Sequence, residues 1–306
     1  MALVACSVCG KPYPENGAPY KCTCGGIYDH VEFPAYQRLE GNPSSGLGSY
    51  FPALGLPANG EMISLGEGNT PLIPFETDKN KIFIKMESQN PTGSYKDRGS
   101  TVLVSFLKSR GVDFAVEDSS GNAGASFAAY CARAGIQARV YAPDSASGPK
   151  RIQIEAYGAN LVLVPGTRSE ATKAVLAAVD QGAVYGSHAS MPFGLCGIAT
   201  MAYELFEQLG QAPGTILVPV GHGGLLYGLM RGFENLEKAG LITRQPYYVG
   251  VQSQGCAPLY DAYRHNNIET CDVPVIYTLA EGVRVTQPAR AKPILKRLQC
   301  EKGRVL

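Results

Sequence analysis

The sequence contains no block of like charges and no long apolar run. Its 27 Lys and Arg residues balance 26 Asp and Glu residues, which gives a formal net charge of +1 over 306 residues. Nucleic-acid-binding proteins usually display a basic patch, so this balance disfavours that class. The most apolar stretch, residues 215–233, is broken by His222, Arg231 and several glycines, which excludes a membrane span.

The N-terminus also lacks the charged and then apolar segments of an export signal. The nine cysteines are odd in number and form no regular framework along the chain, which is typical of reduced thiols. We therefore expect a cytoplasmic protein.

Glycine is abundant, at 36 residues, and short apolar runs alternate with helical patterns. The patterns predict strands at 82–86, 114–116, 138–142, 161–164, 216–220 and 248–251, and helices at 99–110, 123–134, 149–157, 170–181, 198–209 and 225–238. Such alternation predicts βαβ units, and hence an α/β fold of two three-layer domains with mainly parallel sheets. Residues 31–80, rich in Pro and Gly, are expected to form a connector.

Four of the cysteines stand in the first 30 residues, as the pairs Cys6 and Cys9, then Cys22 and Cys24. Glycines follow both pairs and would allow the tight turns that let four thiolates converge on one tetrahedral ion. The segment therefore predicts a zinc-ribbon-like module with a possible structural zinc. The alternative is a metal-free turn module with four incidental thiols.

Lys96 stands at the first turn of a predicted helix, within residues 89–99. The positive end of the helix dipole disfavours another positive charge there. A lysine that must act as a neutral, nucleophilic amine gains from that position. Taken alone, Lys96 could equally be an ordinary lysine on a solvated turn.

Two further strand-to-helix turns carry polar groups. Ser119, Ser120 and Asn122 lie among small residues at a helix start, which suits a carboxylate, although a simple serine cap is the alternative. Residues 221–225 hold three glycines that expose N–H donors suited to phosphate, and no Walker lysine accompanies them. A lysine, a carboxylate site and a phosphate site together predict a pocket for pyridoxal phosphate holding an amino acid.

These motifs resemble those of the fold-type II pyridoxal-phosphate enzymes, and among them the threonine synthase family. Residues 66–72 are similar to that family's GEGxTPL motif, residues 90–99 to its NPTGSFKDRG motif with Tyr95 in place of phenylalanine, and residues 119–126 to its SSGNAGAS loop. The resemblance spans about residues 6–258. It implies a tryptophan synthase β-like fold and a lyase of amino-acid biosynthesis that converts O-phosphohomoserine and water to threonine and phosphate.

The resemblance also implies roles for the matching residues. Lys96 would form the internal Schiff base and later carry the α-proton, and Asn122 would bind the cofactor's 3-hydroxyl. The cofactor phosphate would be bound by the backbone of Gly221, His222, Gly223, Gly224 and Leu225. Substrate contacts are expected from Ser94, Ser119, Ser120, Lys85, Arg98 and Lys150, whereas Arg151 is interpreted as a surface charge.

Two departures from the family keep alternatives open. The GHGGLL loop at 221–226 is more similar to the dehydratase and cysteine-synthase branches, so β-elimination or β-replacement is a second hypothesis. The Ser/Thr motif that faces the cofactor's ring nitrogen has no match before Leu306, so a truncated, non-catalytic relative is a third.

The expected organisation has three parts: a Cys-rich module at 1–30, a large cofactor-binding domain at 31–100 plus 188–306, and a small substrate-side domain at 101–187. The expected partners are a small amino-acid substrate and a second copy in a homodimer, with no nucleic acid and no membrane. His30, His188 and His265 are interpreted as structural.

Overall fold

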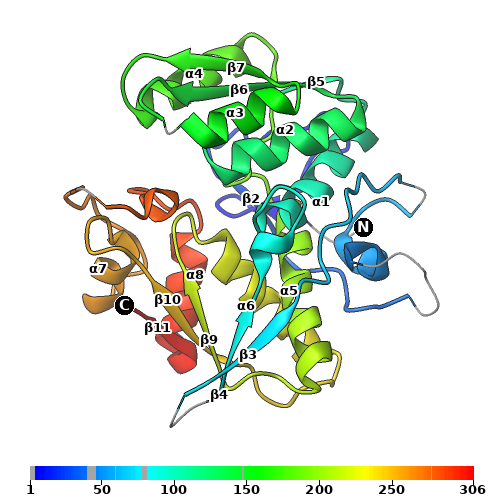
Figure 1. The fold of residues 1–306 in the computed structure, drawn as a ribbon, viewed down its shortest axis with the longest axis vertical. Coiled ribbons are helices and arrows are strands. Elements are labelled where there is room, and N and C mark those ends of the chain that lie inside the picture. Colours follow the sequence, from blue (N-terminus) through cyan, green and yellow to red (C-terminus); the bar gives the residue numbers. More distant parts are fainter. Residues whose placement is uncertain (1–3, 40–45, 59, 78–80, 147, 277) are drawn as a thin grey trace. The chain divides into compact units, whose positions relative to one another are not determined.

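The chain holds two parallel sheets, and helices flank their strands (Figure 1). The computed structural model describes residues 4–39, 46–58, 60–77, 81–146, 148–276 and 278–306. The chain divides into two units, Met1–Gly197 and Ile198–Leu306. Part of the predicted connector, at 40–45, 59 and 78–80, lies outside the described residues.

A four-stranded parallel sheet forms the centre of the first unit, in the order β7-β6-β5-β8. Its strands are β5 (Phe114–Glu117), β6 (Gln137–Pro143), β7 (Asn160–Val164) and β8 (Val184–Tyr185). Since parallel strands end at the same edge of a sheet, the loops that follow β5 and β8 are neighbours.

Helices cover both faces of this sheet. They are α1 (Lys96–Ser109), α2 (Asn122–Ala134), α3 (Gly148–Ala156) and α4 (Arg168–Asp180). Ala115 and Val140 belong to the core that contains α1 and α2, whereas Val116 and Tyr141 pack with Val175 of α4. Successive strand residues point to opposite faces, so α2 and α4 lie on opposite sides and the arrangement has three layers.

The N-terminal segment packs on α1. Its strands β1 (Val4–Cys6) and β2 (Tyr28–His30) pair antiparallel. The ring of Tyr13 stands edge-on to Phe106 and Phe193, whose rings stack 3.5 Å apart. The cysteine segment therefore shares a core with α1.

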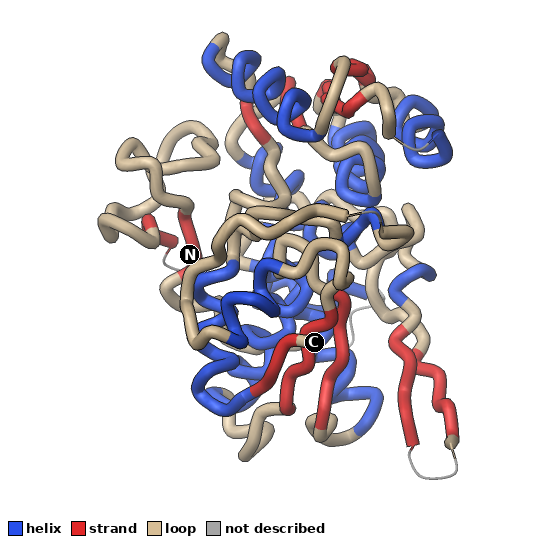
Figure 2. Tube along the Cα trace, turned by 90° about the vertical axis from the view of Figure 1, so that its left-hand side faces the viewer, coloured by secondary structure: helices blue, strands red, loops and turns tan. Residues whose placement is uncertain are grey.

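A second antiparallel pair precedes α1. Strands β3 (Leu72–Glu76) and β4 (Lys81–Lys85) form the hairpin drawn as two adjacent red strands in Figure 2. Short 3-10 turns, η1 (Gly46–Leu54) and η2 (Glu87–Gln89), lie before and after this pair. The turn η2 leads directly into the loop that carries Lys96.

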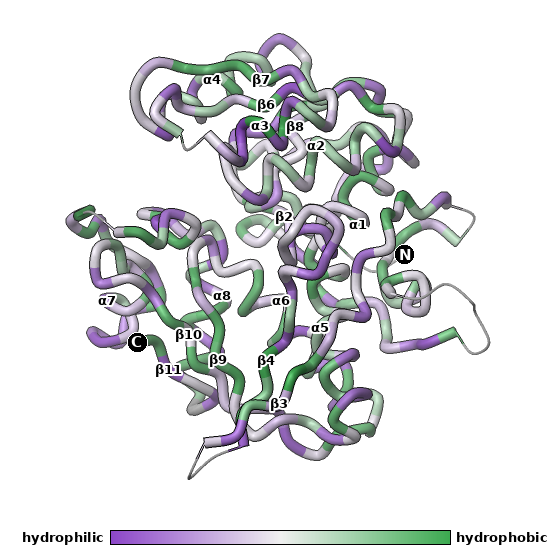
Figure 3. Tube along the Cα trace, viewed as in Figure 1, coloured by the Kyte–Doolittle hydropathy of each residue, from purple (hydrophilic) through white to green (hydrophobic). Residues whose placement is uncertain are grey.

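The second unit holds a parallel sheet in the order β11-β10-β9. Its strands β9 (Thr215–Pro219), β10 (Tyr247–Val251) and β11 (Gly303–Val305) include the apolar segments drawn in green in Figure 3. Its helices are α6 (Gly224–Lys238), α7 (Pro258–Arg264) and α8 (Ala291–Arg297), with short turns η3 (Glu281–Val283) and η4 (Leu298–Lys302). Helix α5 (Gly194–Leu209) begins in the first unit and continues into the second.

Helix α6 packs closely on the part of α5 beyond Gly197. A Cβ at Gly228 would lie 2.5 Å from Cγ2 of Ile198, and one at Gly232 would lie 2.5 Å from the carbonyl oxygen of Ala199. Neither position has room for a side chain. The glycines therefore set how near the two helices approach, and this contact fixes the helix that begins at the glycine loop.

The predicted α/β fold with mainly parallel sheets is confirmed. The expected helices and strands are present with ends shifted by a few residues, and the short elements β1, β2, β3, β8, β11, α7 and α8 were not predicted. The three-part domain organisation stays a prediction. No helix in the described parts of the chain combines the length and apolar character needed to cross a membrane.

Candidate functional site

Lys96 is the first residue of α1, as the sequence predicts. It is half-buried, and its Nζ lies 4.9 Å from the centre of the Tyr95 ring. The adjacent Asp97 is fully buried and accepts hydrogen bonds from the backbone N–H of Thr92 at 2.7 Å and from the Ser126 hydroxyl at 2.6 Å. Burial raises the pKa of Asp97, while these donors oppose the rise. Asp97 thus fixes the loop before Lys96 and ties it to α2.

The Ser119–Asn122 loop joins β5 to α2. Ser119 is buried and Ser120 half-buried, while Asn122 is exposed as the first residue of α2. A Cβ at Gly124 would lie only 1.9 Å from the carbonyl oxygen of Ser119, so glycine lets the loop fold back on its own helix. Because Ser126 of α2 binds Asp97, the structure holds this loop and the Lys96 loop to one another.

Two buried groups anchor the remaining motif, residues 66–72. Glu67 accepts hydrogen bonds from the hydroxyls of Thr101 in α1, at 2.7 Å, and Tyr130 in α2, at 2.6 Å. Asn90 accepts one from the backbone N–H of Gly68 at 2.9 Å. Three segments that are separate in the sequence are therefore locked together around the start of α1.

The three predicted cations differ in their surroundings. Arg98 is completely buried and donates to both carboxylate oxygens of Glu87 at 2.8 Å, while Lys85 donates to the carbonyl oxygen of Thr70 at 2.8 Å. Lys150, half-buried on α3, donates to Gln153, which itself donates to the carbonyl oxygen of Thr92 in the Lys96 loop. Arg98 therefore has a structural ion pair, and its predicted contact with substrate stays a prediction.

Ser94 is buried, and its hydroxyl oxygen accepts a 3.4 Å hydrogen bond from the backbone N–H of Lys96. Arg151, interpreted as a surface charge, is half-buried and donates to the carbonyl oxygen of Asp144. Ser94 thus lies directly at the start of α1.

Sequence reasoning missed one pair beside these loops. His188 places Nδ1 2.5 Å from Oε1 of Glu117, the last residue of β5. Burial, followed by the neighbouring Asp118, raises the pKa of Glu117 well above its usual range, against the positive charges of Arg168 and Lys96. An acidic residue that closes an apolar strand just before the serine loop was the available signal.

The predicted phosphate loop lies in the second unit, between β9 and α6. Gly223 has φ +88° and its Cβ would lie 2.2 Å from Cδ1 of Ile294, so only glycine fits there. Gly224 begins α6, and the first N–H groups of a helix lack partners within the helix. Gly221, His222, Gly223, Gly224 and Leu225 therefore form a tight turn at a helix start, which is a donor set that fits a phosphate.

The four N-terminal cysteines come together, and their sulfur atoms all lie within 4.8 Å of one another. The Cys6–Cys24 and Cys9–Cys22 sulfur distances are 3.4 and 3.6 Å. Bonds of about 2.3 Å around a tetrahedral zinc would place thiolates about 3.8 Å apart. The backbone N–H of Cys24, followed by hydrogen bonds from the neighbouring cysteine side chains, lowers the pKa of Cys22 to about 6 against the effect of burial. The cluster could hold a metal ion.

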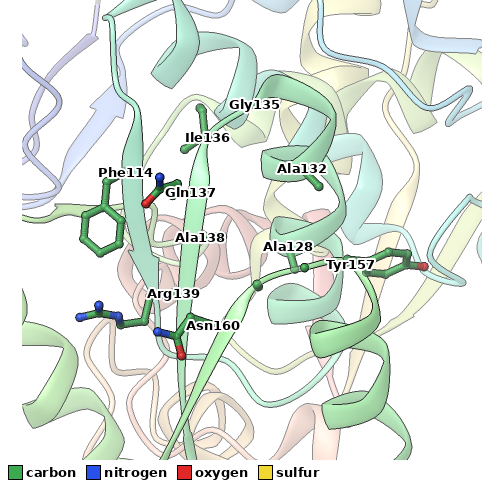
Figure 4. Close-up of a pocket in the computed structure, with 12 residues that line it drawn as sticks. Phe114, Ala128, Ala132, Gly135, Ile136, Gln137, Ala138, Arg139, Tyr157 and Asn160 are labelled. Atoms are coloured by element: carbon green, nitrogen blue, oxygen red, sulfur yellow. The ribbon is translucent and has the colours of Figure 1, made fainter.

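A separate groove of about 460 Å³ lies at the amino ends of β5, β6 and β7 (Figure 4). Phe114, Gln137, Arg139, Tyr157 and Asn160 contribute to its lining. None of its lining residues is a predicted site residue, and the Ser119–Asn122 loop follows the opposite, carboxyl end of β5.

Comparison with known proteins agrees with this geometry. The sequence pattern of the family described as pyridoxal-phosphate dependent enzyme matches residues 63–305. The chain belongs to this family. Lys96 at the start of α1 in the first unit, and the glycine loop with no room for a side chain at Gly223 in the second, each fit a part of this cofactor.

Relatives within the family include the threonine synthase of Methanocaldococcus jannaschii, 33% identical over 98% of this chain and 78% of that protein. The threonine synthase of Synechocystis is 33% identical over 79% of this chain, and the matched region covers 63% of that relative's length. Maize serine racemase, 22% identical, matches in structure with a TM-score of 0.67 over 78% of this chain and 71% of that one, which shows the fold alone.

Proposed function

We propose that this protein is a threonine synthase that converts O-phosphohomoserine and water to threonine and phosphate. The observation that carries the proposal is Lys96 at the start of α1, held against the Ser119–Asn122 loop by the Asp97–Ser126 hydrogen bond. The similarity to threonine synthases over nearly the whole chain supports this choice of reaction.

The side chains around α1 and α2 would bind and orient the substrate. Lys96 would bind the cofactor covalently and, once released, accept the substrate's α-proton on Nζ. The hydroxyls of Ser119 and Ser120 would bind the substrate carboxylate at the start of α2, and Asn122 would donate to the cofactor's 3-hydroxyl. The N–H groups of residues 221–225 would bind the cofactor phosphate. Pyridoxal phosphate supplies the electron sink that makes removal of the α-proton possible.

Lys150 is our candidate for binding the second anion, the substrate's own phosphate. The guanidinium of Arg98 is engaged by Glu87, whereas Lys150 has only the neutral Gln153 as a partner among the described residues. Gln153 also links Lys150 to the Lys96 loop through Thr92. Substituting Lys150 by glutamine should raise KM for O-phosphohomoserine more than it lowers kcat.

Absorbance spectroscopy and product analysis test the proposed function. The purified protein should show the visible band of lysine-linked pyridoxal phosphate, and Lys96→Ala should abolish it. Lys108→Ala, an exposed lysine in the last turn of the same helix, is the matched control and should keep the band. Threonine and phosphate should form in equal amounts from O-phosphohomoserine. Turnover of threonine or O-acetylserine instead would assign the protein to an elimination or replacement reaction. Absence of the band would refute the proposal that the protein is a pyridoxal-phosphate enzyme.

We also propose that the cysteine cluster binds a structural zinc ion through Cys6, Cys9, Cys22 and Cys24. Four thiolates leave no open coordination position, so the ion would stabilise the N-terminal segment rather than act on substrate. The purified protein should contain one zinc per chain, and Cys9→Ser should lose most of it. Cys271→Ser, which removes an exposed cysteine elsewhere, should retain the metal. The homodimer and the cytoplasmic location stay predictions.

A further inference from the structure

Gln153 of α3 makes side-chain hydrogen bonds to three different partners. Its Oε1 accepts one from Nζ of Lys150 at 2.8 Å. Its Nε2 donates to the carbonyl oxygen of Thr92 at 3.1 Å and to the hydroxyl of Tyr157 at 3.0 Å. The oxygen and both N–H groups of the amide are therefore engaged, which fixes the orientation of this side chain. The proposed function uses Lys150 but assigns no task to Gln153.

An amide matches the two groups that this side chain joins. The ammonium of Lys150 can only donate hydrogen bonds, and the carbonyl oxygen of Thr92 can only accept them. The group between them must therefore accept on one side and donate on the other. Glutamine does so in one orientation, because the flipped amide would set N–H against the ammonium and oxygen against the carbonyl. A glutamate or a methionine of similar length cannot donate to Thr92.

The Thr92 end of this bridge is fixed relative to Lys96. The backbone N–H and the hydroxyl of Thr92 both donate to the carboxylate of Asp97, at 2.7 and 2.5 Å. Thr92 and Asp97 are buried, and Asp97 directly follows Lys96 in α1. The carbonyl oxygen of Thr92 therefore has a set position at the start of α1, which does not depend on Gln153.

Helix α3 is also held independently of this bridge. It lies beside α2 (Figure 1), and Ile154, the neighbour of Gln153, is fully buried. A Cβ at Gly124, in the first turn of α2, would lie 3.2 Å from Cδ1 of Ile154. Packing at the start of α2 thus holds the α3 backbone, so loss of the Gln153 hydrogen bonds should leave the helix in place.

The side chain of Lys150 depends most on the bridge. It is half-buried, and among the described residues the neutral amide of Gln153 is the one hydrogen-bond partner of its ammonium. A lysine side chain loses much rotamer freedom when it is ordered. Because Gln153 orders Nζ before substrate arrives, an anion that binds there need not meet this cost. Two of the three N–H donors of the ammonium are left for that anion.

We propose that Gln153 is a positioning residue that holds the Lys150 ammonium at the distance from Lys96 that the substrate's phosphate requires. This inference rests on the proposed function, in which Lys150 binds that phosphate. The hydrogen bonds run from Lys150 through Gln153 to Thr92, and from Thr92 to Asp97, the neighbour of Lys96. Gln153 acts through Lys150 and takes no part in proton transfer.

Steady-state kinetics of the holoenzyme test this role. Gln153→Met keeps the length of the side chain and removes the bridge. Its KM for O-phosphohomoserine should rise about 10-fold, the effect of one hydrogen bond to a charged group, while kcat changes less than about 3-fold. The absorbance band of lysine-linked pyridoxal phosphate should remain. Gln181→Met, the same change at an exposed glutamine that follows α4, is the matched control and should leave KM unchanged.

Binding of inorganic phosphate gives a readout that is independent of turnover. In the holoenzyme the cofactor's phosphate would fill the glycine loop at 221–225, so added phosphate reports on the second anion site. Its dissociation constant, measured by calorimetry, should rise about 10-fold in Gln153→Met and stay constant in Gln181→Met. Gln153→Glu should weaken phosphate binding at least as much, because the carboxylate neutralises the charge of Lys150 and cannot donate to Thr92. It also serves as the second variant if methionine disturbs α3.

A double variant separates positioning from a structural role. In Lys150→Gln the cation is already absent, so the further change Gln153→Met should alter KM less than about 2-fold. An equal rise of KM in both backgrounds would overturn the positioning role, as would unchanged KM and phosphate affinity in Gln153→Met alone. A wild-type enzyme that forms no threonine and phosphate from O-phosphohomoserine would refute the proposed function itself, and the positioning role with it.

Discussion

Replacing Gly124 by alanine tests whether contact with α2 sets the position of the Ser119–Asn122 loop. The new Cβ would lie 1.9 Å from the carbonyl oxygen of Ser119 and 3.2 Å from Cδ1 of Ile154. Atoms in ordinary contact lie about 3.5 Å apart, so the loop backbone must retreat by about 1.5 Å. The obstacle is backbone, which cannot rotate away as a flexible side chain does.

The expected cost follows from two opposing effects. Overpacking lowers the free energy of unfolding by up to about 3 kcal/mol, whereas the higher helix propensity of alanine raises it by about 1 kcal/mol. The free energy of unfolding should therefore fall by about 2 kcal/mol. The displaced loop carries Ser119 and Asn122, and a misplacement of about 1 Å can cost about 100-fold in rate, so activity should fall by at least that factor.

Urea denaturation and steady-state kinetics measure the two effects. Gly148→Ala is the matched control, because Gly148 begins α3 and its Cβ would meet nothing within 4 Å. That variant should keep full activity and be equally or slightly more stable. If Gly124→Ala proves as stable and as active as the control, the loop is not set by this contact.

Three further predictions concern stability. Phe106→Ala removes a ring stacked at 3.5 Å on its neighbour and should lower the free energy of unfolding by about 3–5 kcal/mol in urea titrations. Arg98→Met removes the buried cation that pairs with Glu87, whose side chain is 15% exposed, and should lower the free energy of unfolding by about 3 kcal/mol; the double variant with Glu87→Leu should recover part of this loss, and no recovery would contradict the pairing. The raised pKa values of Asp97 and Glu117 mean that the folded state holds their protons longer than the unfolded state. Their contribution to stability is full below the ordinary carboxyl pKa of about 4 and is lost as pH rises through the raised values, so Glu117→Gln should flatten that decline in thermal melts.

The sequence alone determined the local structure of the site. Glycine ended the predicted helices where a positive φ is required, as at Gly111 (φ +70°) and Gly135 (φ +68°). Lys96 and Asn122 were expected at helix starts, and each is the first residue of its helix. The two cysteine pairs were expected to converge and do so. These features depend on residues near in sequence, where backbone preferences and apolar periodicity act directly.

The tertiary structure decided which charged groups meet. The sequence offered Arg98 as a substrate-binding cation, and the fold buries it against Glu87. It offered His188 as a structural histidine, and the pairing of β8 with β5 brings it to Glu117. The three-residue strand β11 likewise has no clear sequence pattern, and only its pairing with β10 identifies it as a strand. A buried charge is stable only where the fold supplies its partner, and here the partners of buried or strand-end groups came from strand order and helix packing rather than from any local pattern.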